Sequence, residues 1–145
     1  MKSKAAVRRI IDTLKATYPD AICSLQYEKD YELLFAVRLS AQCTDARVNQ
    51  VTPELYRRFP TLQSFAEADP AEVGVYIHSC GFFNGKARDI VACAGKLLAE
   101  FGGKVPGTME ELTSLPGVGR KTANLILGDI YHQPAYVCDT HCIRI

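Results

Sequence analysis

The sequence feature that most limits the possible folds is the helical spacing of apolar residues along almost the whole chain. Near the N-terminus four apolar residues recur at intervals of three and four, so they share one face of a helix: Val7, Ile10, Ile11 and Leu14. The segment 31–42 is apolar nearly all round, which is typical of a helix at the centre of a domain. No stretch combines alternating apolar and polar residues with hairpin turns. The pattern therefore predicts an all-α fold of about seven short helices.

Start and stop signals divide this pattern into separate helices. Asp69 and Pro70 form a strong start for the helix at 70–80. Gly102 can end a different helix, the one at 86–101. We expect Asp30 to cap the central helix and Pro53 to kink or restart the one after it. The expected helices cover residues 7–17, 31–42, 45–55, 70–80, 86–101, 108–114 and 120–131, with a loop at 82–85.

Charge and composition restrict the functional classes only loosely. The chain has 17 Lys and Arg against 16 Asp and Glu, a net charge of +1, which neither indicates nor excludes a local nucleic-acid site. With 48% apolar and 23% charged residues it has an ordinary globular composition. It contains no apolar run of about 18 residues, the length expected of a membrane span. The charged N-terminus is unlike a secretory signal, so we expect an intracellular protein.

The cysteines do not indicate a metal site. Six are present, and no two form a C-x-x-C pair. In an intracellular protein most of them are expected to be small buried residues. The tightest group, Cys138, His141 and Cys142, lacks a fourth ligand. The sequence therefore favours no metal in this chain.

The most specific segment is LPGVGRKTAN at 115–124, which lies between two expected helices. Gly117 and Gly119 allow a tight turn and leave no side chain between the backbone and a ligand. The free amides and positive dipole end of the following helix face the same space, and Arg120 and Lys121 add positive charge. We therefore predict an anion site at this turn.

Four segments together resemble the helix-hairpin-helix DNA glycosylases, and most closely endonuclease III. They are LLFAVRLSAQCTDARVN at 33–49, IHSCGFFNGKARDI at 77–90, LPGVGRKTANLIL at 115–127 and VCDTHCIRI at 137–145. The resemblance covers essentially the whole chain and implies the all-α fold of that family, with the hairpin at 108–131. It also implies base-excision DNA repair. The family flips oxidised pyrimidines out of duplex DNA, removes them and cleaves the abasic site by β-elimination.

The resemblance assigns roles to particular residues. Lys121 matches the amine that attacks the sugar and forms a Schiff base, and Asp139 matches the carboxylate that activates it. Gln42 matches the residue that fills the gap left by the flipped base, and Phe82 matches an apolar wedge. Taken alone, Phe82 could equally be a core aromatic and Asp139 a helix cap. The other residues expected at the DNA are Lys86 and the hairpin residues Leu115, Pro116, Gly117, Val118, Gly119 and Arg120, with Asp45 and Arg47 as weaker candidates.

The resemblance also predicts the domain organisation. Residues 1–20 are expected to form a helix that partners a second domain, 21–134 the helical domain with the hairpin, and 135–145 the start of the second domain. The family binds a [4Fe–4S] cluster through a C-x6-C-x2-C-x5-C array, and no cysteines of this chain have that spacing. We therefore expect a fragment or a truncated product.

Partners and location follow from the same resemblance. The expected partner is double-stranded DNA with a damaged base or an abasic site, with no membrane, and the full-length form is expected to be a monomer. We expect a bacterial cytoplasmic location, close to the nucleoid, or another intracellular one.

Two alternatives remain open at this point. An adenine mismatch DNA glycosylase would share the hairpin and the aspartate, but that branch commonly lacks a lysine at the position of Lys121. A non-catalytic helix-hairpin-helix DNA-binding fragment would need neither Lys121 nor Asp139. The presence of both favours a bifunctional glycosylase and abasic-site lyase.

Overall fold

The computed structural model describes residues 1–144 and confirms the all-α prediction. Over those residues it contains nine α-helices and one short 3-10 helix, and no strand. The helices are α1 (Lys4–Thr17), α2 (Asp30–Leu39), α3 (Asp45–Arg58), α4 (Leu62–Ala66), α5 (Pro70–Ile77), η1 (His78–Cys80), α6 (Phe83–Phe101), α7 (Met109–Thr113), α8 (Arg120–Asp129) and α9 (Thr140–Arg144). Within 1–144, no helix is both long and apolar enough to cross a membrane.

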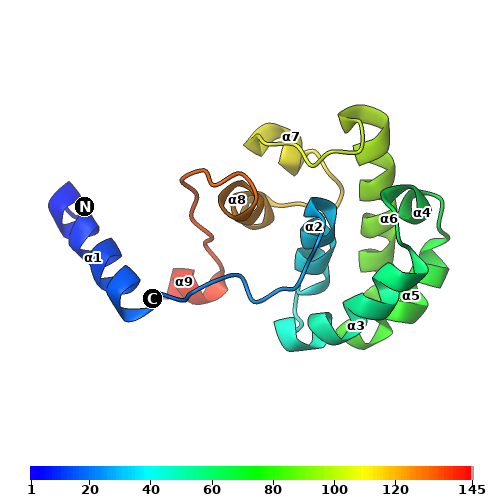
Figure 1. Cartoon of the computed structure of the whole chain (residues 1–145), viewed down its shortest axis with the longest axis horizontal. Helices are drawn as coiled ribbons and strands as arrows, with labels where there is room; N and C mark the ends of the chain where they lie inside the picture. The colour runs from blue at the N-terminus through cyan, green and yellow to red at the C-terminus, as the bar shows by residue number, and fades with distance from the viewer. Residues whose placement is uncertain (145) are drawn as a thin grey trace.

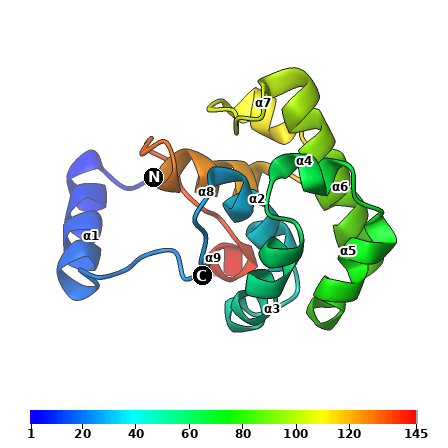
Figure 2. The ribbon, with the colours of Figure 1, turned by 45° about the vertical axis from the view of Figure 1, so that its right-hand side comes forward.

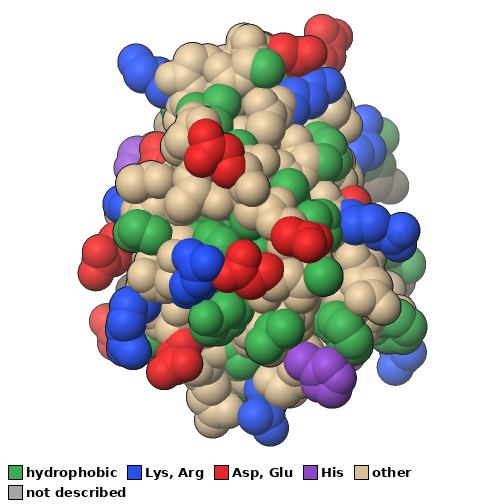
Figure 3. All heavy atoms as spheres, turned by 90° about the vertical axis from the view of Figure 1, so that its right-hand side faces the viewer, with side chains coloured by type: hydrophobic (Ala, Val, Ile, Leu, Met, Phe, Trp, Pro, Cys, Tyr) green, Lys and Arg blue, Asp and Glu red, His purple; other side chains and the backbone are tan. Residues whose placement is uncertain are grey.

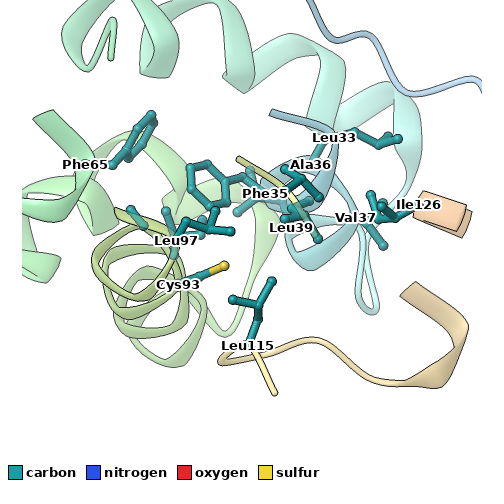
Figure 4. Close-up of a cluster of buried hydrophobic side chains, with 14 of the residues drawn as sticks. Leu33, Phe35, Ala36, Val37, Leu39, Phe65, Cys93, Leu97, Leu115 and Ile126 are labelled. Carbon is teal, nitrogen blue, oxygen red and sulfur yellow. The ribbon is translucent and has the colours of Figure 1, made fainter. Parts of the chain in front are cut away.

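Helix α2 lies at the centre and packs against α3, α6 and α8 (Figure 1). Both its faces are covered, which explains why nearly every side chain from Leu33 to Leu39 is buried. Phe65 of α4 packs on Phe35, with a ring centroid distance of 5.0 Å (Figure 4), and its centroid lies 5.1 Å from that of Phe59. Leu115, which follows α7, points into the same cluster (Figure 4). The central helix and the turn before α8 therefore share one core.

The face over α4, α5 and α6 carries charges of both signs. Lys and Arg side chains are interspersed there with Asp and Glu and with apolar groups (Figure 3). A ligand that needs a concentrated positive surface is not favoured on this face.

Helix α1 stands apart from the rest of the described chain in both ribbon views (Figures 1 and 2). None of its residues is buried. Its predicted apolar stripe is present but exposed, from 42% at Ile10 to 53% at Leu14. The partner domain that we expected for residues 1–20 stays a prediction.

Several helix boundaries differ from the prediction. Helix α2 begins at Asp30 rather than after it, and Glu32 accepts hydrogen bonds from the amides of Glu28 and Lys29 at 2.8 and 3.1 Å. The helix ends at Leu39 instead of 42, because the chain turns there and Gln42 adopts a left-handed backbone with φ 52°. The backbone amides just before α2 are therefore satisfied by the side chain of Glu32, which lies inside the first turn of the helix.

Three further expectations were wrong. Pro53 does not restart a helix, because it lies inside α3, which runs from Asp45 to Arg58. Helix α4 was not expected; Thr61 caps it by accepting from the amide of Ser64. The segment 82–85 is not a loop, since α6 starts at Phe83.

Candidate functional site

The hairpin between α7 and α8 is built as the sequence predicts. Thr108 accepts from the amide of Glu111 and starts α7, and the amide of Val118 donates to the carbonyl of Leu115 at 3.2 Å across the turn. Leu115 is 2% exposed. Its side chain therefore anchors the hairpin, and any contact of this residue with a ligand is limited to its backbone.

Gly117 is required by the fold of the hairpin. Its φ is 76°, a backbone conformation that favours glycine. A Cβ at this position would lie 3.0 Å from Arg38 Cδ and from Asp89 Cβ. Arg38 of α2 and Asp89 of α6 form an ion pair with an Nε–Oδ2 distance of 2.7 Å. The turn therefore packs against this ion pair, which no local pattern in the sequence predicts.

Gly119 is not required by the fold. It is the N-cap residue of α8, with φ −96° and ψ −178°, which other residues adopt readily. A Cβ there would meet no atom of the described chain within 4 Å beyond its chain neighbours. Gly119 offers no side-chain cap, so the first amides of α8 have no side-chain hydrogen bond from their N-cap residue.

Lys121 and Asp139 line one cleft of about 650 Å³. Lys121 is exposed in the first turn of α8, and Asp139 precedes α9 after the chain doubles back past the end of α8. The segment 40–45, which joins α2 to α3, forms the remaining wall with Gln42 and Cys43 among its residues. Residues far apart in the sequence are thus brought to one cavity.

The carboxylate of Asp139 is held in its ionised form. Its Oδ1 accepts from the amide of Cys142 at 2.8 Å, which is the largest cause that lowers the pKa of this carboxyl. The positive charges of His141 and Lys121 act in the same direction, against the opposing effect of burial. Asp139 is therefore both a helix cap and a cleft residue, two roles that the sequence allowed together.

Gln42 and Phe82 are both exposed, and both have a left-handed backbone, with φ 52° and 46°. Phe82 is 73% exposed, so it is not the core aromatic that the sequence also allowed. Its neighbour Phe83 is half-buried and packs its ring on His78 at a centroid distance of 4.5 Å. Of these two adjacent phenylalanines, Phe83 is therefore packed against the fold and Phe82 is exposed to solvent.

Lys86 corrects an expectation. It is 1% exposed, and its Nζ donates to the carbonyl oxygens of Leu39, Ala41 and Cys80 at 2.9, 2.8 and 3.0 Å. An ammonium group has three protons, so all are used. Burial also lowers the pKa of Lys86. The ammonium group therefore has no proton left for a DNA phosphate; it ties the C-terminal end of α2 to η1.

The weaker candidates divide between the cleft wall and the surface. Asp45 lines the cleft and accepts a hydrogen bond from Ser24 Oγ. Arg47 and Arg120 are exposed, and Pro116 and Val118 are partly buried in the hairpin. Among residues 1–144, no group of three or more His, Cys, Asp or Glu side chains is placed to hold a metal ion.

The comparison with known families decides to which one the chain belongs. The model of the HhH-GPD superfamily of base excision DNA repair proteins matches residues 35–145. The chain belongs to this superfamily. Within it, the chain is 48% identical over 98% of its length to endonuclease III of Synechocystis sp. and 38% identical over 93% to that of Bacillus subtilis. It spans 65% and 62% of the lengths of these two relatives.

Solved structures agree with this membership. A non-covalent endonuclease III–DNA complex superimposes with a TM-score of 0.90 at 40% identity, over 99% of this chain and 67% of that one. A thermostable thymine-DNA glycosylase superimposes with a TM-score of 0.85 at 18% identity, which shows the shared fold alone. The HhH-GPD relatives carry the endonuclease III name, so the adenine mismatch alternative is not favoured.

The [4Fe–4S] cluster that the endonuclease III relatives suggest does not fit the described residues. The required cysteine spacing is absent from the sequence, and no ligand cluster is formed within 1–144.

Proposed function

We propose that this chain holds the catalytic and lesion-binding residues of a DNA N-glycosylase with abasic-site lyase activity, acting on oxidised pyrimidines in duplex DNA. The observation that supports this most directly is the single cleft that Lys121 and Asp139 line together with Gln42. An amine, an ionised carboxylate and a gap-filling amide are the groups that the reaction needs in one place.

The amine of Lys121 is the nucleophile. In its neutral form it attacks C1′ of the damaged nucleotide, a C–N bond forms, and the glycosidic bond breaks as the base leaves with a proton. Loss of the ring C–O bond gives a Schiff base between Nζ and C1′. Removal of a proton from C2′ then expels the 3′ phosphate by β-elimination and nicks the strand. Water finally releases the lysine.

Asp139 assists these reaction steps through its negative charge. Its carboxylate stays ionised at neutral pH because the Cys142 amide, His141 and Lys121 all favour the charged form. It can accept a proton from the attacking amine and stabilise positive charge that develops on the sugar. Its position before α9 fixes the carboxylate at the wall of the cleft.

The hairpin and two exposed side chains would hold the substrate. Gly119 leaves the first amides of α8 open to a backbone phosphate, a contact that positions DNA without reading its sequence. Phe82 supplies an exposed apolar ring to wedge a base step, and Gln42 a polar side chain beside the cleft. Unstacking of the lesion would then deliver C1′ to Lys121.

Borohydride trapping tests the nucleophile. The whole protein, incubated with a duplex that contains an oxidised pyrimidine, should give a covalent protein–DNA adduct, and Lys121→Ala should abolish it. Lys104→Ala is the matched control, because Lys104 is another exposed lysine outside the cleft. Equal adduct yield from Lys121→Ala would remove Lys121 from the mechanism.

A second variant separates charge from structure at Asp139. Asn caps a helix about as well as Asp. Asp139→Asn should therefore keep the hydrogen bond from the Cys142 amide and lose the negative charge. We expect retained folding with greatly reduced strand nicking. Full nicking by this variant would show that Asp139 acts only as a helix cap and not in the reaction.

A further inference from the structure

The ion pair of Arg38 and Asp89 lies where the three segments proposed to meet DNA come together. Arg38 is in the last turn of α2, four residues before Gln42. Asp89 is in the second turn of α6, the helix that directly follows Phe82. The hairpin packs on both, since a Cβ on Gly117 would lie 3.0 Å from Arg38 Nε and from Asp89 Cβ. Helix α2 contacts both α6 and α8 and lies between them in Figure 1.

The guanidinium group of Arg38 has hydrogen-bond donors to spare. Its Nε donates to Asp89 Oδ2 at 2.7 Å, and within residues 1–144 the group makes no other hydrogen bond. A guanidinium carries five N–H donors, so the four on its two terminal nitrogens have no partner in the described chain. The Arg38 side chain is 29% exposed, unlike the enclosed Lys86. It is therefore fixed at one nitrogen and partly open to solvent.

This arrangement suits a phosphate group. The planar fork of a guanidinium matches two phosphate oxygens, and the charge on both partners strengthens the hydrogen bonds. A side chain that is already held at Nε loses less conformational freedom when it binds. Among the exposed arginines, Arg57 is instead paired with Glu54 of its own helix, far from the hairpin.

We propose that Arg38 binds a backbone phosphate of duplex DNA beside the hairpin. The inference rests on the proposed function for its ligand, which is duplex DNA. The contact would lie between the hairpin and the segment of Gln42. It would position the duplex without reading its sequence, so damaged and undamaged DNA would benefit alike.

The competing explanation is that the ion pair only supports the turn at Gly117. Salt dependence separates the two roles. Each phosphate that a cation neutralises releases counterions, so one lost contact lowers the slope of log affinity against log salt by about one. A loosened turn lowers the free energy of unfolding, but it removes no cation from a phosphate.

The first test uses the double variant Arg38→Gln/Asp89→Asn of the whole protein. It removes one charge of each sign, so the net charge stays at +1 and no carboxylate is left unpaired near DNA. Fluorescence anisotropy with an undamaged duplex, over a series of salt concentrations, should show about threefold to tenfold weaker binding at low salt. The slope should fall by about one.

The matched control is Arg57→Gln/Glu54→Gln. Those two side chains form an exposed ion pair with an N–O distance of 3.5 Å, at the end of α3 opposite the one that meets the cleft. We expect its affinity and slope to equal those of the parent. Urea unfolding of both double variants reports whether the fold is kept. Unchanged affinity of the Arg38 variant, or weaker binding with an unchanged slope, would overturn the proposal.

A footprint on the unaltered protein decides the matter even if the variant does not fold. Phenylglyoxal modifies accessible guanidinium groups. A protease that cuts after glutamate places Arg38 in peptide 33–54 and Arg57 in peptide 55–67, and fragmentation in the mass spectrometer locates each modification. We expect Arg38 to react in the free protein and to be protected by undamaged duplex, while Arg57 reacts equally in both. An unreactive Arg38, or equal reaction with and without DNA, would overturn the contact.

These measurements need no catalysis, so the two proposals can fail separately. A protein that binds duplex with Arg38 protected, yet never nicks a duplex with an oxidised pyrimidine, refutes the proposed reaction and leaves the contact standing. A protein that nicks while Arg38 stays unprotected refutes the contact alone.

Discussion

The substitution Gly119→Asp should stabilise the protein and weaken its grip on DNA. Gly119 is the N-cap of α8, and a side chain there meets open space. Aspartate is a better N-cap than glycine, because its carboxylate accepts from a free amide of the first turn. The same carboxylate would occupy the place where the amides of α8 are proposed to meet a phosphate.

The two effects have opposite signs and can be estimated. The cap adds a few tenths of a kcal/mol, and the negative charge at the helix N-terminus about 0.3–1 kcal/mol. Two like charges about 4 Å apart repel by about 1 kcal/mol in water and about 4 kcal/mol at an effective dielectric constant of about 20. Affinity for any duplex should therefore fall by about fivefold to several hundredfold.

Urea unfolding and fluorescence anisotropy with undamaged and damaged duplexes measure both quantities. Gly119→Ser is the matched control, because it caps the helix without a charge and should lose much less affinity. Gly117→Ala should instead destabilise the fold, since φ is 76° and its methyl group would lie 3.0 Å from Arg38. Unchanged affinity of Gly119→Asp for both duplexes would refute a phosphate contact at this amide group. A loss confined to damaged DNA would show that the turn recognises the lesion instead.

Two further predictions concern buried or capped charges. Lys86→Met leaves the three carbonyls of Leu39, Ala41 and Cys80 without their donor and should lower the free energy of unfolding by about 3 kcal/mol or more in urea titration; an unchanged midpoint would contradict the tie between α2 and η1. The pKa of Asp139 is lowered in the fold, so its cap on α9 should be fully present above the usual carboxyl range near about 4 and be lost as the pH falls through the lowered value. The chemical shift of the Cys142 amide should follow that transition, and a midpoint above the ordinary range would reverse the sign of the argument.

Local signals in the sequence predicted much of the helical framework. Asp69 and Pro70 begin α5, and Thr108 begins α7, because an N-cap side chain bonds an amide only two or three residues further along. The spacing of apolar residues predicted the all-α class, and the two glycines predicted the turn at 115–119. The cleft residues Lys121 and Asp139 were reached through the resemblance, and the structure brings them to one cavity.

What the sequence could not give depends on contacts between distant segments. Helix α4 has five residues, too few for an apolar period to be recognised. Pro53 lies within α3 beside the buried Thr52 and Leu55, tertiary contacts that the local sequence does not reveal. The burial of Lys86 needs carbonyls from two other segments, and no local pattern pairs a lysine with oxygens 45 and 47 residues away.

The enclosed ammonium of Lys86 also makes this lysine chemically silent. Amine reagents need a neutral nitrogen with a free lone pair, and here all three protons are engaged while the side chain is 1% exposed. Lys121, exposed in the first turn of α8, has no such protection. Under reductive methylation the two residues would thus act as independent reporters in one spectrum. Lys121 would reveal whether the cleft is occupied, and Lys86 would become methylated only in molecules in which α2 and η1 have come apart.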